Sequence, residues 1–172
     1  MSLKRFLILS FLSIFALSMF SCNETEEETN EKFEWNYVKR KMQIQGTDTS
    51  WVIESTEKYI VDEYSVLRDS NMMRIMGHTT SNDSIVIDIL NSNPGKTITV
   101  GEYNISGENR YNIQFFKGTF PFISVNGYAY IQYINSRVDI EFYSPLSNGY
   151  TLENGVAENL DVYLVPELPS ED

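Results

Sequence analysis

Apolar and polar side chains alternate with a period of two through much of this 172-residue chain, and this alternation constrains its fold more than any other feature. Residues 137–143 show it most clearly, because Val138, Ile140 and Phe142 are apolar and the residues between them are charged. Such a pattern is typical of a strand that packs on a core with one face and meets water with the other. It occurs in ten segments, which are residues 41–46, 51–54, 58–64, 72–79, 84–90, 97–105, 111–117, 127–134, 137–143 and 159–165.

Turn-forming sequences separate these segments. Asn135-Ser136 has the length of a two-residue hairpin loop, and Asn93-Pro94-Gly95 is typical of a turn. Further turns are expected at residues 106–109, 125–127, 147–149 and 153–155. No segment keeps a helical period over three turns. We therefore predict an all-β fold, either an antiparallel β-sandwich or a closed β-barrel of about ten short strands.

The N-terminal segment is typical of an export signal. Lys4 and Arg5 precede an uncharged, mainly apolar stretch at residues 6–20, and Cys22 follows it. A signal peptide has a basic start and an apolar centre of roughly 7–15 residues, whereas a transmembrane helix needs about 20 apolar residues. We therefore expect residues 1–21 to be a signal peptide that is removed.

Cys22 is the only cysteine of the chain. The sequence Met19-Phe20-Ser21-Cys22 resembles a bacterial lipobox, at which cleavage leaves a lipidated cysteine as the new N-terminus. The alternative is ordinary cleavage after Ala16-Leu17-Ser18, which would leave a free thiol. Because an unpaired cysteine is uncommon in an exported protein, we expect lipidation of Cys22 and attachment to a membrane through that lipid.

The remaining chain divides into a tether, a domain and a tail. Residues 22–34 are predicted to be an acidic tether, since their like charges repel and cannot build a core. Residues 35–166 suit a single β domain, and residues 167–172 are expected to be an acidic tail. The acidic run after Cys22 is similar to the sorting signal of Bacteroidota lipoproteins. This resemblance implies an outer-membrane protein displayed on the cell surface rather than on the periplasmic face.

The domain itself resembles a loose group of small Bacteroidota lipoproteins that carry an uncharacterised all-β domain, a domain of unknown function. The resemblance rests on Gly46 with Trp51, on the strand opening Gly101-Glu102-Tyr103, and on closing hairpins between residues 118 and 155. It spans most of residues 40–165 and implies no catalytic residues. Trp51 and Tyr103 are expected to be core or rim aromatics.

The charge and motifs of the chain argue against several functions. A formal net charge of −11 disfavours nucleic acid, whose phosphates need Lys and Arg. His78 is the only histidine and is expected at a surface or turn near a strand end. No nucleophile elbow, zinc motif or calcium loop is present. Asp139 and Glu141 share a strand face with Arg137, as on an ordinary wet face. We therefore expect no enzymatic activity, no metal and no cofactor.

Aromatic side chains are the remaining candidates for a binding site. Tyr128 and Tyr130 would share one face of a strand, with Tyr133 on the other. They could pack across strands or, if exposed, stack on sugar rings. The first hypothesis is therefore a lipid-anchored, non-enzymatic β domain that binds extracellular glycan. The alternatives are an accessory or structural lipoprotein that docks onto a larger cell-envelope complex, and a barrel that carries a small apolar ligand in an interior cavity.

Overall fold

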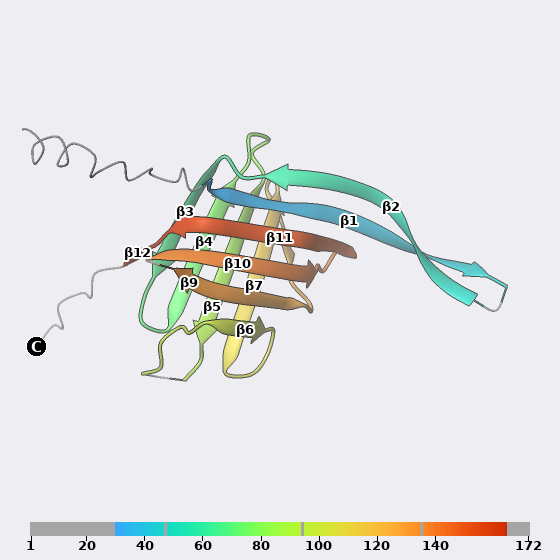
Figure 1. The fold of residues 1–172 in the computed structure, drawn as a ribbon. Helices are drawn as coiled ribbons and strands as arrows, with labels where there is room; N and C mark the ends of the chain where they lie inside the picture. The colour runs from blue at the N-terminus through green and yellow to red at the C-terminus, as the bar shows by residue number, and fades with distance from the viewer. Residues whose placement is uncertain (1–29, 47, 94, 135, 165–172) are drawn as a thin grey trace, which may run out of the picture.

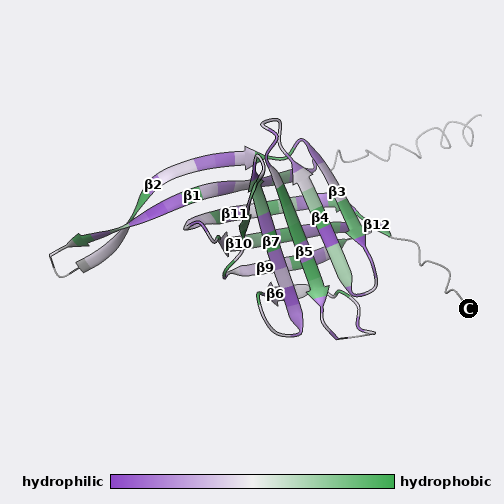
Figure 2. Ribbon diagram, turned by 180° about the vertical axis from the view of Figure 1, so that it is seen from behind, coloured by the Kyte–Doolittle hydropathy of each residue, from purple (hydrophilic) through white to green (hydrophobic). Residues whose placement is uncertain are grey.

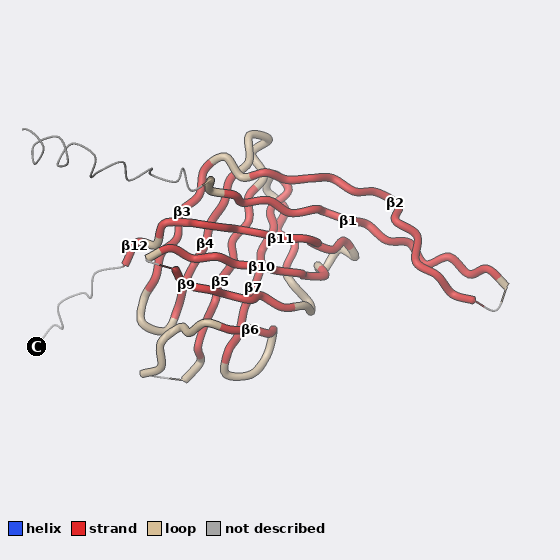
Figure 3. Tube along the Cα trace, in the orientation of Figure 1, coloured by secondary structure: helices blue, strands red, loops and turns tan. Residues whose placement is uncertain are grey.

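The computed structural model describes residues 30–164 except residues 47, 94 and 135, and in this part of the chain every regular element is a strand (Figure 3). The twelve strands are β1 (Lys32–Gln45), β2 (Asp48–Ile60), β3 (Glu63–Arg68), β4 (Met72–His78), β5 (Ser84–Asn91), β6 (Gly101–Asn104), β7 (Asn109–Lys117), β8 (Phe120–Ile123), β9 (Tyr128–Ile134), β10 (Arg137–Pro145), β11 (Tyr150–Asp161) and β12 (Tyr163–Leu164). The predicted all-β class is confirmed.

All twelve strands belong to one sheet, in the order β12-β3-β4-β5-β7-β6-β9-β10-β11-β1-β2, with β8 added beside β7. The pairing is antiparallel except between β12 and β3 and between β6 and β7. The sheet curls strongly into a half-barrel, in which β9, β10, β11 and β1 cross over β3, β4, β5 and β7 (Figure 1). Neither expected form of closure, the sandwich or the closed barrel, is confirmed.

The core lies between these two walls of the curled sheet. Ile85, Ile87 and Ile89 on β5 are fully buried, as the alternation of that segment predicts. On the facing wall, Val138 and Ile140 of β10 are buried in the same way. Figure 2 shows most of β5 in the hydrophobic colour. Period-two patterning therefore places the apolar face of both walls inward.

Aromatic rings fill the part of the core beneath β1 and β2. Trp35 stacks on Tyr59 with ring centroids 5.5 Å apart and meets Phe115 of β7 edge-on at 5.8 Å. Tyr37 lies against the same Phe115 ring at 5.1 Å. Such ring pairs stabilise a core beyond the area that they bury. They fix the β1–β2 hairpin to the opposite wall.

Beyond the body, the β1–β2 hairpin continues as a two-stranded arm. β11 pairs with β1 only as far as Lys39, so residues 40–46 and 48–53, which we call the arm, have no third strand beside them in the described part of the chain. Figure 1 shows the arm projecting from the half-barrel. Trp51 lies on it and is 62% exposed, so it is not a core residue, whereas Tyr103 is fully buried.

Two local predictions differ from the structure. Residues 153–155, expected to be a turn, lie inside β11, where Asn154 has a positive φ of 51° at an irregularity in the pairing with β1. Asn tolerates this left-handed conformation, so a turn-like sequence forms a β-bulge here. β1 begins at Lys32 and Phe33 is buried, so three residues expected in the tether belong to the domain. By contrast, Ile134 pairs with Arg137, which confirms the hairpin predicted between β9 and β10.

Candidate functional site

The outer face of β6, β9, β10 and β11 carries its polar and aromatic side chains in rows that run across the strands. The register sets these rows, because directly paired residues project from the same face. One row consists of Asn104, Tyr128 and Tyr143. The next row consists of Glu102, Tyr130 and Glu141. Residues that are distant in sequence thereby form one surface.

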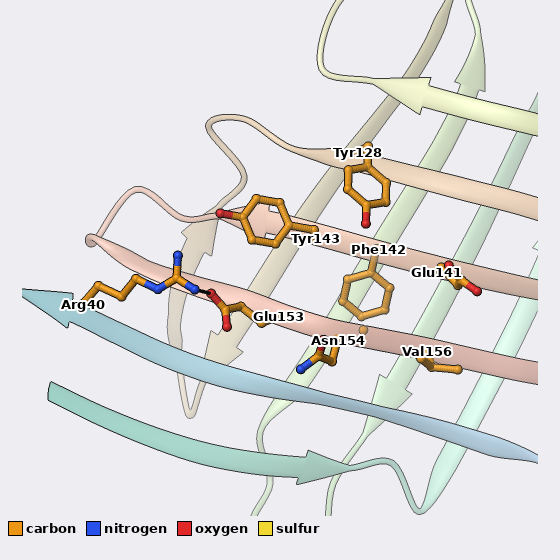
Figure 4. A pocket seen from close by; sticks show the side chains of 9 residues that line it. Arg40, Tyr128, Glu141, Phe142, Tyr143, Glu153, Asn154 and Val156 are labelled. Atoms are coloured by element: carbon orange, nitrogen blue, oxygen red, sulfur yellow. Dashed lines mark ion pairs between the residues drawn. The ribbon is translucent and has the colours of Figure 1, made fainter. Parts of the chain in front are cut away.

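The first row provides a pair of aromatic rings. Tyr128 on β9 and Tyr143 on β10 lie with ring centroids 6.2 Å apart and ring planes inclined by 25° (Figure 4). Tyr128 is 43% exposed. Its ring is therefore held by a neighbouring ring while part of its surface stays open to solvent.

The second row places a tyrosine between two carboxylates. Tyr130 is 36% exposed and pairs with Glu102 on one side and Glu141 on the other. Both glutamates are exposed, and neither forms an ion pair with a described residue. Asn104 donates a hydrogen bond from Nδ2 to Oε1 of Glu102, 3.1 Å away. Carboxylate oxygens on this face are available to accept hydrogen bonds from a ligand.

A groove of about 500 Å³ runs beside the tyrosine pair (Figure 4). Tyr128, Tyr143 and Glu141 line it together with Asn154 of β11. A smaller hollow of about 110 Å³ is lined by Tyr130 and shares Glu141 with the groove. The two predicted tyrosines therefore lie beside adjoining depressions, and Glu141 lies at their common border.

Arg40 and Glu153 close one end of the groove. They form an ion pair between β1 and β11 (Figure 4). The side chain of Glu153 is only 16% exposed, so its carboxylate is largely shielded from water. Because each charge already has a partner of opposite sign, the pair supports the wall of the groove and contributes little net charge to it.

The connection before β9 fixes the position of Tyr128. The Tyr111 hydroxyl donates a hydrogen bond to the carbonyl of Asn126, 2.7 Å away, and burial raises the pKa of Tyr111, so the hydroxyl keeps its proton. Gly127 adopts a φ of +115°. A Cβ atom at this position would lie 2.0 Å from the carbonyl oxygen of Tyr143. Only glycine allows so close an approach of the chain to β10.

The remaining candidate residues are not brought together into a reaction centre. His78 is exposed at the end of β4, as expected. The carboxylate of Asp139 accepts a hydrogen bond from the backbone N–H of Asn159, 2.7 Å away, and so stabilises an irregular position of β11. Tyr133 packs against the core on the other face from Tyr128 and Tyr130, as predicted. Cys22 lies outside the described residues.

Sequence reasoning missed several residues in the groove and in the rows beside it. Tyr143 continues the outward series of Asp139 and Glu141, so alternation could have identified it. Glu102 could not be placed next to Tyr130 without the strand order, because β6 inserts between β7 and β9. Asn154 was obscured because its sequence resembles a turn.

This arrangement can stack a flat ligand on tyrosine and accept hydrogen bonds from its donors. Within the described ranges, no group of three or more His, Cys, Asp or Glu side chains is placed to hold a metal ion. The same part of the chain contains no helix with the length and apolar character needed to cross a membrane.

Comparisons with protein-family models, with curated proteins and with solved structures found no match to this chain.

Proposed function

We propose that this protein is an outer-membrane lipoprotein, anchored through Cys22 and displayed on the cell surface, whose β domain binds extracellular glycan without modifying it. The binding site would be the outer face of β9 and β10. The observation that carries the proposal is the pairing of the exposed Tyr128 with the half-buried Tyr143 beside a groove bordered by Glu141.

The physical basis is the chemistry of sugars. A pyranose ring has an apolar C–H face that stacks on an aromatic ring, and hydroxyl groups around its edge that donate hydrogen bonds. Tyr128 supplies the aromatic surface, while Glu141 and Asn154 supply oxygen acceptors beside it. Sites of this kind combine apolar area with a few polar groups that fix orientation.

The test is a glycan array probed with the full chain in detergent. We expect binding to at least one oligosaccharide, and we expect Tyr128→Ala to weaken it by about 5- to 150-fold, because loss of one aromatic ring on which a ligand stacks costs about 1–3 kcal/mol. Tyr163→Ala, at an exposed tyrosine of β12, is the matched control and should bind like the wild type. Absence of binding to every glycan would rule out this function.

The arm supports a second candidate function, docking onto another protein of the cell envelope. Met42 pairs with Trp51 and Arg40 with Ile53, so one face of the arm carries Met42, Trp51 and Ile53, with Ile44 beyond them at 73% exposure. Exposed apolar patches mark interaction surfaces, and a two-stranded ribbon is only marginally stable by itself.

A protein is a better occupant for this face than an anionic lipid surface. Lys39 is paired with Glu54 and Arg40 with Glu153, and Lys41, which pairs with Val52 in the register, lies on the opposite face of the arm. In native gels of detergent-solubilised envelopes, the wild type should migrate within a larger complex, and Ile44→Ser/Trp51→Ser should migrate alone. Equal migration of both proteins would contradict docking through the arm, and dimers of the purified chain would identify self-association instead.

The third hypothesis, a barrel that carries an apolar ligand, has less support. The space beneath β1 and β2 is filled by the stacked rings of Trp35 and Tyr59 and by Phe115, which meets both of them edge-on.

A further inference from the structure

The charge of the groove face constrains which saccharides it can accept. Glu102 and Glu141 flank Tyr130 in a single row, and neither has an ion-pair partner among the described residues. Glu158 of β11 borders the smaller hollow and adds a third exposed carboxylate. A ligand on the tyrosines therefore meets several negative charges on one face.

Three cations near this face are already engaged, whereas Arg110 of β7, which pairs with Asn104 and forms no ion pair with a described residue, lies beyond β6 from Tyr130. Arg40 is held by Glu153 at the end of the groove. Arg137 contacts Asp161 at 3.1 Å and donates a hydrogen bond to Asn159. Lys32, which pairs with Glu158 in the register, forms its ion pair with Glu34 at 3.1 Å. Arg40, Arg137 and Lys32 are thus directed toward acidic partners of the same chain and do not neutralise the carboxylates beside Tyr130.

We infer that the groove selects neutral and amino saccharides and rejects saccharides that carry carboxylate or sulfate groups; this inference rests on the proposed glycan-binding function. A sugar hydroxyl or ammonium group donates a hydrogen bond to Glu141, and the ammonium adds charge attraction. A uronate or sulfate offers only acceptors at that position and meets like charge. Repulsive contacts of this type are an effective means of discriminating between ligands of similar shape.

The position of Glu141 makes it the main determinant. It borders both the groove beside Tyr128 and the hollow beside Tyr130, so a saccharide that covers both tyrosines must pass over it. Glu102 of β6 lies on the other side of Tyr130 and repels an acidic ligand from that side.

The experiment compares oligosaccharides that share a backbone and differ in charge. The full chain in detergent is titrated on an array of hexagalacturonate and its methyl ester, chitin hexamer and its 6-sulfate, and chitosan hexamer. In each neutral–acidic pair of which at least one member binds, we expect the affinity of the neutral hexamer to be at least roughly tenfold higher. This ratio is what unfavourable charge placement in an interface produces. Raising the salt concentration to about 0.5 M should narrow this ratio, because the carboxylates are exposed.

Two variants locate the effect. Glu102→Gln/Glu141→Gln removes the charges while keeping the shape, and it should reduce the ratio to within about threefold by strengthening acidic ligands. Glu63→Gln/Glu108→Gln removes the same net charge away from the groove and should leave the ratio unchanged.

The outcomes separate the inference from the function on which it rests. Binding of neutral and amino hexamers, with weak binding of the acids, supports both. Equal or tighter binding of hexagalacturonate or the sulfated hexamer overturns the selectivity and leaves glycan binding in place. No binding to any of these hexamers or to any other oligosaccharide of the glycan array overturns glycan binding itself, and the inference with it. A ratio that responds equally to both double variants would also overturn the role of Glu141.

Discussion

Gly127 lies between β8 and β9, directly before Tyr128, and its backbone conformation fixes where Tyr128 lies. Its φ of +115° and its close approach to the Tyr143 carbonyl leave no room for a side chain. Gly107 has a similar φ of +105°, but a Cβ atom there would meet nothing within 4 Å. An alanine at position 107 would therefore suffer backbone strain alone, whereas an alanine at position 127 would suffer strain and a steric collision.

We predict that Gly127→Ala lowers the free energy of unfolding by about 3–4 kcal/mol, because it adds collision with a backbone atom to the strain of a positive φ. Gly107→Ala, the matched control, should cost only about 1–2 kcal/mol, the strain alone. Urea unfolding of the two variants and the wild type measures the difference. Equal losses would mean that the chain next to β10 relaxes easily.

At the scale of single residues, alternation predicted the site only in part. It placed Tyr128 and Tyr130 on one face and Tyr133 on the other, because side-chain direction in a strand depends only on parity. It could not identify Glu102 or Arg40 as neighbours of these tyrosines. Their proximity depends on which strands pair, and pairing is decided by contacts between distant parts of the chain.

At the scale of elements, the β1–β2 hairpin has two parts with different packing. Its base carries Trp35, Tyr37 and Tyr59, all buried, while the arm extends beyond the body. The arm adds exposed apolar surface without contributing those rings. We therefore expect the stability of the domain to depend on the base of the hairpin, and docking onto another protein to depend on the arm.

We predict that the arm can be removed without unfolding the domain. Replacing residues 41–52 by Asn-Gly joins the paired residues Arg40 and Ile53 through a short hairpin turn. The free energy of unfolding should change by less than about 1 kcal/mol, as for surface changes away from the core. Trp35→Ala, by comparison, should cost about 3–5 kcal/mol. A truncation as destabilising as Trp35→Ala would show that the arm belongs to the core.

The buried tyrosines predict a loss of stability at alkaline pH. Burial raises the pKa of Tyr59 and of Tyr133 from the ordinary value of 10.0 to about 12. Below pH 10 both residues are neutral in the folded and unfolded chain, so stability does not depend on them. Between pH 10 and 12 only the unfolded chain ionises, so the urea midpoint should fall as pH rises. Tyr59→Phe/Tyr133→Phe should reduce this fall, whereas Tyr163→Phe should not.

The sequence revealed the strands of the body better than those of the arm. β5 and β10 have one buried face, so their alternation is regular. For β1 and β2 the sequence predicted only shorter segments. One reason is that the arm has no buried face, and another is that Glu54 has no partner between the pairs Lys39–Ser55 and Arg40–Ile53. The alternating Phe33, Trp35 and Tyr37 at the start of β1 were a usable signal that the acidic surroundings obscured.

At the scale of the whole molecule, the sheet brings the two ends of the domain together. β1 pairs with β11, and β6 lies between β7 and β9, so neighbours in the sheet are often distant in sequence. Local patterns predicted an all-β chain but did not determine this order. The half-barrel results from long-range pairing and from the twist of each strand.

The anchor is tested on the whole protein. We predict that Cys22→Ala abolishes acylation and releases the protein from the membrane fraction, since the lipid is proposed as its attachment. Mass spectrometry of the native chain should find an acylated Cys22 at the mature N-terminus. An intact thiol at position 22, or a Cys22→Ala protein that stays in the membrane fraction, would contradict the lipoprotein assignment.

The most direct test of the proposed function is a crystal structure of the protein with the neutral hexamer that it binds most tightly. We predict density for a sugar ring stacked on Tyr128 beside Tyr143, with a hydroxyl group within hydrogen-bond distance of Glu141. A saccharide bound on another face of the half-barrel, with the Tyr128–Tyr143 pair left uncovered, would contradict it.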